Sequence, residues 1–199
     1  MSRRIIIGLT GNIATGKSAV MRLAAERGAQ VIDADRVVHE LLQNDEDIQT
    51  AVVTAFGPGA RTPDGRIDRA ALGRIVFGDD QLLRQLEDLL HPAVREEIAR
   101  RVAASDAPVT MIEAIKLIGG PLAAVCDQIW VTTCSRETQL ERLRVCRGMD
   151  VESAVARVEA QPSQEEKIAR ADVVIHTDGL MTVTQEQFER AWAGLSQAK

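Results

Sequence analysis

The chain has 199 residues, a formal net charge of −5 at pH 7 and aromatic side chains at only 3% of its positions. Its length suits one domain with small inserts, and a hydrophobic content of 45% suits a globular fold. The acidic balance and scarce aromatic residues exclude the basic, stacking surface of a nucleic-acid-binding protein. Because the apolar stretches are too short for a membrane span and the N-terminus leads directly into a strand, we expect a cytoplasmic protein. Its expected partner is a small molecule, with no nucleic acid and no membrane.

The first predicted strand leads into a phosphate-binding loop. Residues 5–9 form a continuous apolar run, typical of a strand buried on both faces, and the pattern Gly11-x-x-x-x-Gly16-Lys17-Ser18 follows. The glycines allow a tight turn with inward-pointing amides, and the next helix adds the positive end of its dipole. We expect Lys17 to reach the β- and γ-phosphates of a nucleotide and Ser18 to ligate the bridging Mg²⁺. The predicted nucleotide-binding residues are Gly11, Asn12, Ile13, Ala14, Thr15, Gly16, Lys17, Ser18 and Ala19.

An acidic pair ends the second predicted strand. A helix over residues 18–27 and a strand over residues 30–32 complete a β-α-β unit, and Asp33-Ala34-Asp35 follows. Because ligands bind at the carboxyl edge of parallel strands, we expect Asp33 beside the phosphate loop. Its carboxylate could accept a proton from an acceptor hydroxyl or hold a water on magnesium, and we favour the general base. Asp35 is explained by a helix N-cap.

Residues 36–104 predict helices and no strand. A leucine-rich face over residues 82–90 predicts a helix that ends before His91-Pro92, and Pro92 suits the first turn of a further helix to residue 104. So much helix between two strands indicates an inserted lobe. N-capping acids mark the expected helix starts, at Asp35, Asp47, and Asp68 or Asp80.

Three more apolar segments predict strands, at residues 108–115, 128–134 and 172–176. With the first two strands they give an α/β fold, a doubly wound parallel sheet of five strands. Glu113 stands at the end of the third strand, where proteins with a phosphate loop often place a magnesium-organising carboxylate. An ordinary acid at a strand end is the alternative.

The densest run of arginine follows the fourth predicted strand. Arg136, Arg142, Arg144 and Arg147 lie within twelve residues. Because two glutamates stand near them at helical spacing, one interpretation is a solvated, salt-bridged face. Phosphoryl transfer, however, needs cations that close over the transferred group. We therefore favour a lid in which Arg142 and Arg147 serve catalysis.

The motifs also separate classes of nucleotide-binding protein. The chain has no guanine-reading Asn-Lys-x-Asp, which argues against a switch GTPase. Glu113 is followed by Ala114 rather than by the second acid usual in a motor ATPase. A small-metabolite kinase combines a phosphate loop, an acid at the second strand, a helical acceptor lobe and an arginine-rich lid, and it fits best.

Two segments besides the loop are specific: Asp-Gly-Arg-Ile-Asp-Arg at residues 64–69 and Leu-His-Pro within residues 86–95. With residues 7–18 and 31–35 they make the chain resemble the dephospho-CoA kinase family over nearly its whole length. Further matching positions are Leu72, Gly73, Val76, Phe77, residues 139–147, Ala156, Arg157, Gln161, Lys167, Ala171 and Asp172.

The resemblance implies a P-loop kinase that uses ATP and Mg²⁺ to phosphorylate the ribose 3′-hydroxyl of dephospho-CoA. The products are CoA and ADP, in the last step of CoA biosynthesis. In the family, the Asp corresponding to Asp33 is the proposed base, and the residues corresponding to Lys17 and Arg147 stabilise the transferred group. The implied organisation is a nucleotide-binding core in residues 1–35, 105–135 and 160–199, a CoA-binding lobe in residues 36–104 and a lid in residues 136–159. We expect a monomer or small homo-oligomer.

Substrate binding is expected at residues that lie near these motifs. For His91 and Arg95 an equally good explanation is structural, because His-Pro often ends one helix and begins another. The candidate substrate-binding residues are Thr10, Asp33, His91, Arg95 and Glu113.

The chain departs from the usual pattern of the family at a few positions. Asn12 and Ala14 stand where glycine is common, Glu113 where Asp is common, and His176 to Gly179 where an Asn is frequent. Two alternatives remain open from the sequence. One is a kinase for another small alcohol, such as shikimate or gluconate. The other is a module that binds a nucleotide without turning it over.

Overall fold

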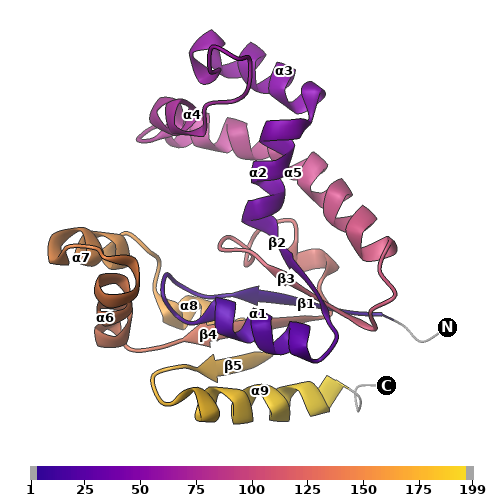
Figure 1. Ribbon diagram of the computed structural model, residues 1–199, viewed down its shortest axis with the longest axis vertical. Helices are drawn as coiled ribbons and strands as arrows, with labels where there is room; N and C mark the ends of the chain where they lie inside the picture. Colours follow the sequence, from indigo (N-terminus) through magenta and orange to yellow (C-terminus); the bar gives the residue numbers. More distant parts are fainter. Residues whose placement is uncertain (1–3, 196–199) are drawn as a thin grey trace. The chain divides into compact units, whose positions relative to one another are not determined.

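The computed structural model describes residues 4–195, and the chain divides into two compact units (Figure 1). The sheet unit comprises the chain up to Ile32 and from Ser105 onward, and the helical unit comprises Asp33–Ala104. Each unit has its own hydrophobic core.

Five parallel strands form the sheet in the order β2-β3-β1-β4-β5. Strand β1 is central, with Ile7 opposite Met111 of β3 and Gln128 of β4. The predicted α/β fold with a five-stranded parallel sheet is confirmed. The strands are β1 (Ile5–Thr10), β2 (Gln30–Asp33), β3 (Val109–Glu113), β4 (Gln128–Thr133) and β5 (Val173–His176).

One face of the sheet is covered by α1 (Lys17–Glu26) and α9 (Met181–Leu195), which contact each other. Leu9, Trp130 and Phe188 are fully buried in the shared core. The rings of Trp130 and Phe188 meet edge to face with centroids 5.9 Å apart. Burial of this much apolar surface fixes α1, and with it the loop between β1 and α1.

The opposite face of β1 is covered by the segment after β3. A Cβ added to Gly8 would lie 2.6 Å from Leu117 Cδ2 and 2.8 Å from Cys126 Sγ, so only glycine fits there. Burial raises the pKa of the Cys126 thiol to about 12. That thiol therefore packs as a neutral group at pH 7.

Three further helices belong to the sheet unit: α6 (Arg136–Arg147), α7 (Val151–Glu159) and α8 (Gln164–Ile168). Helices α6 and α7 pack together beyond the carboxyl end of β4, while α8 contacts β4 itself (Figure 1). Arg136 of α6 forms an ion pair with Glu159 of α7 at 2.9 Å. The predicted lid, residues 136–159, is thus a pair of packed helices.

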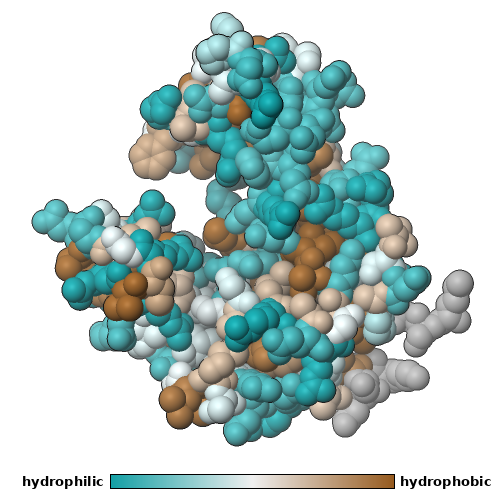
Figure 2. Space-filling view, viewed as in Figure 1, coloured by the Kyte–Doolittle hydropathy of each residue, from teal (hydrophilic) through white to brown (hydrophobic). Residues whose placement is uncertain are grey.

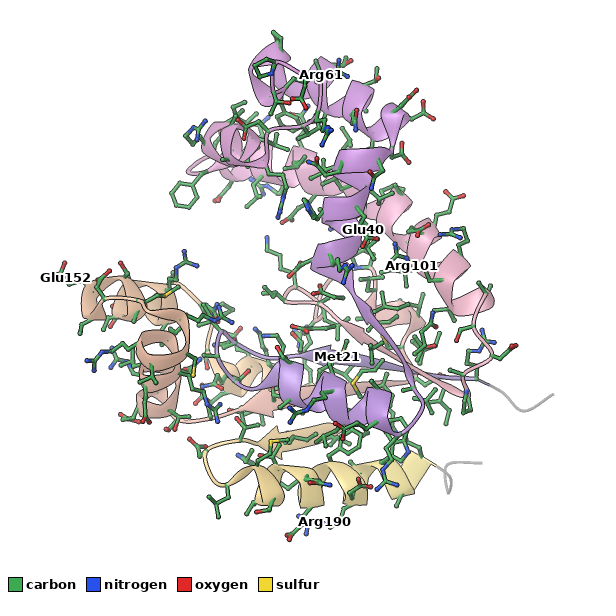
Figure 3. All side chains as sticks on the ribbon, viewed as in Figure 1. Met21, Glu40, Arg61, Arg101, Glu152 and Arg190 are labelled. Atoms are coloured by element: carbon green, nitrogen blue, oxygen red, sulfur yellow. The ribbon has the colours of Figure 1, made fainter. Side chains whose placement is uncertain are left out.

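Because β2 ends at Asp33, the rest of the helical unit, residues 34–104, contains no strand of the sheet, in agreement with the sequence pattern. Its apolar side chains meet in a core built from all four of its α-helices. Glu40 of α2 and Arg101 of α5 point toward each other in an ion pair (Figure 3). The helices are α2 (Ala34–Asn44), α3 (Glu46–Phe56), α4 (Arg69–Val76) and α5 (Asp80–Ala103), with a short 3-10 turn at Pro58–Ala60.

The caps of these helices correct three predictions. Helix α2 is capped by Asp33 rather than Asp35, α3 by Asp45 rather than Asp47, and α5 by Asp79 rather than Asp80. Each correct cap has an acid next to it or two residues further along, which then lies in the first turn, where it also favours the helix dipole. Local composition therefore could not choose between the two acids. The expected cap at Asp68 is confirmed.

The prediction that a helix ends before His91-Pro92 is wrong. Helix α5 runs unbroken through Pro92 from Asp80 to Ala103. Leu90, Val94 and Ile98 follow one another at four-residue spacing and are all buried, so one apolar face continues across the proline. The burial of this face offsets the hydrogen bond that the proline cannot donate.

The visible surface mixes hydrophilic and hydrophobic residues rather than gathering the latter into one large patch (Figure 2). In the part of the chain that the structure describes, no helix is both long and apolar enough to cross a bilayer.

Candidate active site

The phosphate loop lies between β1 and α1 and needs glycine at both ends. Gly11 has φ 154° and Gly16 has φ 86°. A Cβ on Gly11 would lie 2.4 Å from Thr132 Oγ1, and one on Gly16 would lie 3.1 Å from Thr177 Cγ2. Backbone conformation therefore favours glycine at both positions, while packing excludes a side chain at Gly11 and leaves little room for one at Gly16.

Three side chains from other segments bond the loop at Ile13 and Ala14. Gln139 Nε2 donates to the Ile13 carbonyl at 2.7 Å, and Gln161 Oε1 accepts from the Ile13 amide at 2.6 Å. Arg142 donates to the Ala14 carbonyl at 3.0 Å. Together they hold Ala14 at φ 60°, a left-handed conformation that costs a non-glycine residue about 1–2 kcal/mol.

Lys17 extends back across the loop. Its Nζ donates to the carbonyls of Gly11 at 3.0 Å and Asn12 at 3.1 Å, and lies 3.9 Å from Glu113 Oε1. The side chains of Lys17 and Glu113 are 11% and 19% exposed. The structure thus joins the predicted phosphate lysine to the predicted strand-end acid, and the pair brings β3 to the loop.

The N-terminus of α1 differs from those of α2 to α8. Each of the latter has an Asp or Ser side chain that accepts a hydrogen bond from a first-turn amide. Helix α1 has Gly16 as its N-cap residue, with no side-chain cap and no acidic residue in its first turn. Its first amides and dipole are therefore available to a bound anion, as the loop motif predicts.

Arg142 and Arg147 occupy different surroundings on α6. Arg142 is half-buried and donates to Ala14, to Thr177 Oγ1 at 3.0 Å and to the Thr177 carbonyl. Thr177 Oγ1 in turn bonds the Thr15 carbonyl at 3.0 Å. Arg147 is exposed, and no residue between 4 and 195 forms a hydrogen bond or ion pair with its side chain. The catalytic role of both arginines stays a prediction.

The segment after β5 also contributes charge next to the loop. The Asp178 carboxylate accepts hydrogen bonds from the Ser135 amide at 2.7 Å and Thr138 Oγ1 at 2.9 Å. Burial alone would raise the pKa of Asp178, but these hydrogen bonds and the nearby Arg142 together lower it. Asp178 therefore remains ionised and ties β5 to the start of α6.

Asn12 and Lys167 form a buried contact beneath the loop. Lys167 Nζ donates to Asn12 Oδ1 at 2.7 Å, and Asn12 Nδ2 donates to the Pro162 carbonyl at 2.8 Å. Both side chains are buried. The departure from glycine at position 12 thus adds a side chain with two defined partners.

The helical unit carries three of the predicted site residues. Asp33 is exposed and caps α2, where its Oδ1 accepts from the Arg36 amide at 3.0 Å. His91 is half-buried and Arg95 exposed, one turn apart on α5. Neither has a side-chain hydrogen bond or ion pair with another residue in the described part of the chain. Their substrate roles stay predictions.

Thr10 is the one predicted substrate-binding residue with no exposed surface. Its hydroxyl is fully buried and donates to the Ile115 carbonyl at 3.2 Å. That bond connects the end of β1 with the segment after β3. A role for Thr10 toward the substrate therefore acts through its backbone or through this connection.

The donors at the loop suit magnesium held mainly by a nucleotide. Ser18 is exposed at the start of α1, and Glu113 offers a hard carboxylate oxygen at the end of β3. Among the described residues no group of three or more His, Cys, Asp or Glu side chains could hold a metal ion alone. Mg²⁺ commonly binds through one or two protein oxygens and substrate phosphates, so this donor set fits it.

The comparisons with known proteins place the chain in a family. The family model described as Dephospho-CoA kinase matches residues 5–182. The chain belongs to the dephospho-CoA kinase family. It is 44% identical to the dephospho-CoA kinase of Symbiobacterium thermophilum, over 94% of this chain and 80% of that protein. It is 40% identical to the one of Geobacter sulfurreducens, over 94% of this chain and 97% of the relative.

Solved structures agree with this dephospho-CoA kinase fold. The crystal structure of TT1252 from Thermus thermophilus is 31% identical, with a TM-score of 0.82 and coverage of 99% of both chains. The dephospho-CoA kinase from Campylobacter jejuni shares the fold with a TM-score of 0.61 at 23% identity, covering 96% of this chain and 97% of its own. The predicted family and P-loop kinase fold are thus confirmed, while the roles of the three predicted segments stay a prediction.

The main functional contacts that sequence reasoning missed are those that support the loop from behind. Gln139, Gln161, Lys167 and Thr177 bond its backbone or Asn12, but none belongs to the loop motif. A partial signal existed. The first three lie in segments that carry the family resemblance, and Gln139 stands one turn before Arg142 on α6.

Proposed function

We propose that this chain transfers the γ-phosphoryl group of ATP to the ribose 3′-hydroxyl of dephospho-CoA, giving CoA and ADP in the last step of CoA biosynthesis. One observation carries the proposal: a complete phosphate loop with an uncapped helix N-terminus, in a chain that belongs to the dephospho-CoA kinase family. Family membership also favours dephospho-CoA over shikimate or gluconate as the acceptor.

In the proposed reaction the loop binds the triphosphate. The amides at the start of α1 and the Lys17 ammonium neutralise the β- and γ-phosphates. Lys17 already lies over the loop carbonyls, so a small change of rotamer brings its charge to the anion. Mg²⁺, when bound with the nucleotide, spreads the charge that develops on the transferred group. Ser18 would hold it directly, and Glu113 directly or through water.

Asp33 is proposed as the general base. In phosphoryl transfer the acceptor oxygen attacks phosphorus, the bond from the γ-phosphorus to ADP breaks, and the hydroxyl proton must be taken up. The exposed Asp33 carboxylate at the end of β2 would accept that proton. Its hydrogen bond from the Arg36 amide orients the carboxylate and leaves its other oxygen for the acceptor.

The two arginines of α6 have different proposed roles, one in supporting the phosphate loop and one in lid closure. Arg142 would keep the loop in shape through its bonds to Ala14 and Thr177, and the exposed Arg147 would reach the transferred phosphoryl group when the lid in residues 136–159 closes. The helical lobe in residues 36–104 would bind dephospho-CoA, with His91 and Arg95 on α5 facing it. The enzyme would work in the cytoplasm as a monomer or small homo-oligomer without nucleic acid.

Acceptor choice gives the direct test. ADP formation by the purified chain is measured with Mg²⁺ and ATP in the presence of dephospho-CoA, shikimate, gluconate or no acceptor. Turnover with dephospho-CoA alone, with CoA as the product, is the expected result. Turnover with shikimate or gluconate instead would overturn the proposed acceptor. ATP binding without turnover on any acceptor would make the chain a nucleotide-binding module.

A further inference from the structure

One buried cation lies behind the phosphate loop and takes no part in the steps above. Lys167 is 9% exposed, and its Nζ donates to Asn12 Oδ1 at 2.7 Å. Its ammonium makes no ion pair with a carboxylate of residues 4–195. Buried charges are costly and are normally paired with an opposite charge. An ammonium held by one neutral oxygen therefore keeps most of its charge available to an anion nearby.

Asn12 brings this ammonium next to that of Lys17. The backbone carbonyl of Asn12 accepts from Lys17 Nζ at 3.1 Å, while its side-chain carbonyl accepts from Lys167 Nζ. The amide orientation is fixed by the bond from Nδ2 to the Pro162 carbonyl at 2.8 Å. One loop residue thus joins two positive groups. Burial first, and then the charge of Lys17, lower the pKa of Lys167, as expected for two cations that face a common region.

We propose that Lys167 is a second cation of the phosphate site, and that its charge acts through the loop on the polyphosphate of the bound nucleotide. Its Nζ contacts Asn12 rather than the ligand, so Lys167 is a positioning and electrostatic residue. A charge in a poorly solvated site acts over several ångströms with little screening. The inference rests on the phosphate site proposed above and extends it to a residue some 150 positions away in sequence.

A double-mutant cycle separates the charge of Lys167 from its support of Asn12. Lys167→Met is compared with the parent protein in the wild-type and Asn12→Ala backgrounds, and calorimetry gives the Kd for ATP while thermal unfolding gives the midpoint of the free protein. In the Asn12→Ala background no amide oxygen is left without a donor. There we expect Lys167→Met to weaken ATP binding about tenfold, at an unfolding midpoint that is unchanged or higher.

Each outcome of the cycle decides. An equal loss of ATP affinity in both backgrounds supports the proposal that the charge of Lys167 acts on the nucleotide. A loss that disappears in the Asn12→Ala background would overturn the proposal, because Lys167 would then serve only to hold the Asn12 side chain. Unchanged ATP affinity in both backgrounds would overturn it as well. Wild-type protein that binds no ATP would overturn the phosphate site itself and the inference with it.

Two further variants provide a second test of the charge and a control for the loss of a positive charge elsewhere. Lys167→Gln keeps a hydrogen-bond donor for Asn12 and removes only the charge, so a tenfold weaker Kd is expected there too, even if the double variant does not fold. An unchanged Kd in Lys167→Gln would overturn the proposal. Arg190→Met is the matched control for loss of a positive charge, because Arg190 lies on α9 and points away from the sheet (Figure 3). It should leave the Kd for ATP unchanged.

Discussion

The phosphate loop and the helical unit use polar side chains in opposite ways. Around the loop, Gln139, Arg142 and Gln161 turn inward from distant segments and bond the loop backbone. In the helical unit, Asp33, Asp45 and Asp79 cap helices from next to them in sequence, while apolar side chains fill the core. The loop is therefore held mainly by tertiary hydrogen bonds, whereas the helical unit is held mainly by packing and local caps, with the Glu40–Arg101 ion pair joining α2 to α5.

This difference indicates where each unit can act. Side chains that support the loop are already engaged with the protein, so their loss should alter the shape of the site. Asp33, His91 and Arg95 of the helical unit are at least partly exposed, so they can meet a ligand without breaking internal bonds. We expect weaker ATP binding on loss of the first group, slower turnover on loss of Asp33, and weaker binding of the acceptor on loss of His91 or Arg95.

The largest effect is expected for Asp33→Asn, which should lower turnover by about two to four orders of magnitude and leave ATP binding intact. Asn is as good an N-cap as Asp, so the fold should not change. The rate of ADP formation with dephospho-CoA and the Kd for ATP are the measurements. Asp45→Asn is the matched control, because Asp45 caps α3 with a bond to the Ile48 amide at 3.0 Å, the same length as the bond at Asp33. Near-normal turnover in Asp33→Asn would remove the residue from catalysis.

Replacing the two arginines of α6 should affect different quantities, kcat for one and ATP affinity for the other. Arg147→Ala should lower kcat on the order of 100-fold or more with little change in the Kd for ATP, because its exposed side chain forms no hydrogen bond or ion pair with any described residue. Arg142→Ala should instead weaken ATP binding and lower the unfolding midpoint, because the carbonyls of Ala14 and Thr177 lose their donor. An equal loss of kcat and ATP affinity in Arg147→Ala would make it a simple ground-state binder.

Packing in the helical unit should dominate its stability. Leu90 lies in the core of that unit and is 6% exposed. Leu90→Ala should lower the free energy of unfolding of the protein by about 2–5 kcal/mol. Leu180→Ala is the control, because Leu180 is 76% exposed and should change stability by no more than about 0.5 kcal/mol. Urea unfolding compares the two. A small loss for Leu90→Ala would mean that caps and ion pairs, rather than packing, hold the unit.

An acid-sensitive contribution comes from Glu97 on α5. Hydrogen bonds from Arg100 and then Arg101 lower the pKa of Glu97 from 4.5 to about 2. The folded state thus binds its proton less readily than the unfolded state, so this stabilisation is present above pH 4.5 and is lost as the pH falls toward 2. Allowing for solvent screening, Glu97→Gln should cost about 1 kcal/mol at neutral pH and less at pH ~3.

A neighbouring glutamate provides the control for that experiment. Glu96 is exposed on the same helix and forms no ion pair with any described residue, so Glu96→Gln should change stability at neither pH. Unfolding in urea at the two pH values is the measurement. If Glu97→Gln lowered the free energy of unfolding equally at both pH values, the stabilisation by Glu97 would come from side-chain packing rather than from its charge.

The smallest effect is expected at the strained residue of the loop. Ala14→Gly should stabilise the fold by up to about 1 kcal/mol, because glycine adopts the positive φ of position 14 without strain. Ala99→Gly, on the exposed face of α5, should show the opposite sign and lose about 0.5–1 kcal/mol. Thermal unfolding measures both. A destabilising Ala14→Gly would mean that the greater conformational entropy of glycine in the unfolded chain outweighs the relief of strain.

The sequence by itself determined what depends on near neighbours. Buried strands, the phosphate loop and the leucine-rich face of α5 are periodic or local patterns, and the first glycine of the loop is required by its own backbone as well as by packing. The choice between adjacent acids as helix caps was beyond such patterns, because Asp33 and Asp35 satisfy the same local rule. The continuity of α5 through Pro92 likewise depended on the burial of Leu90, Val94 and Ile98.

Only the tertiary structure decided what supports the loop. Gln161, Lys167 and Thr177 meet it because the parallel sheet brings the carboxyl ends of β1, β4 and β5 to one edge, and their contacts span about 150 residues of sequence. Hydrogen bonds of that range leave no periodic trace in a single chain. The same holds for Arg142 and Arg147, which look alike in sequence and differ only because one turn of α6 faces the loop and the next faces solvent.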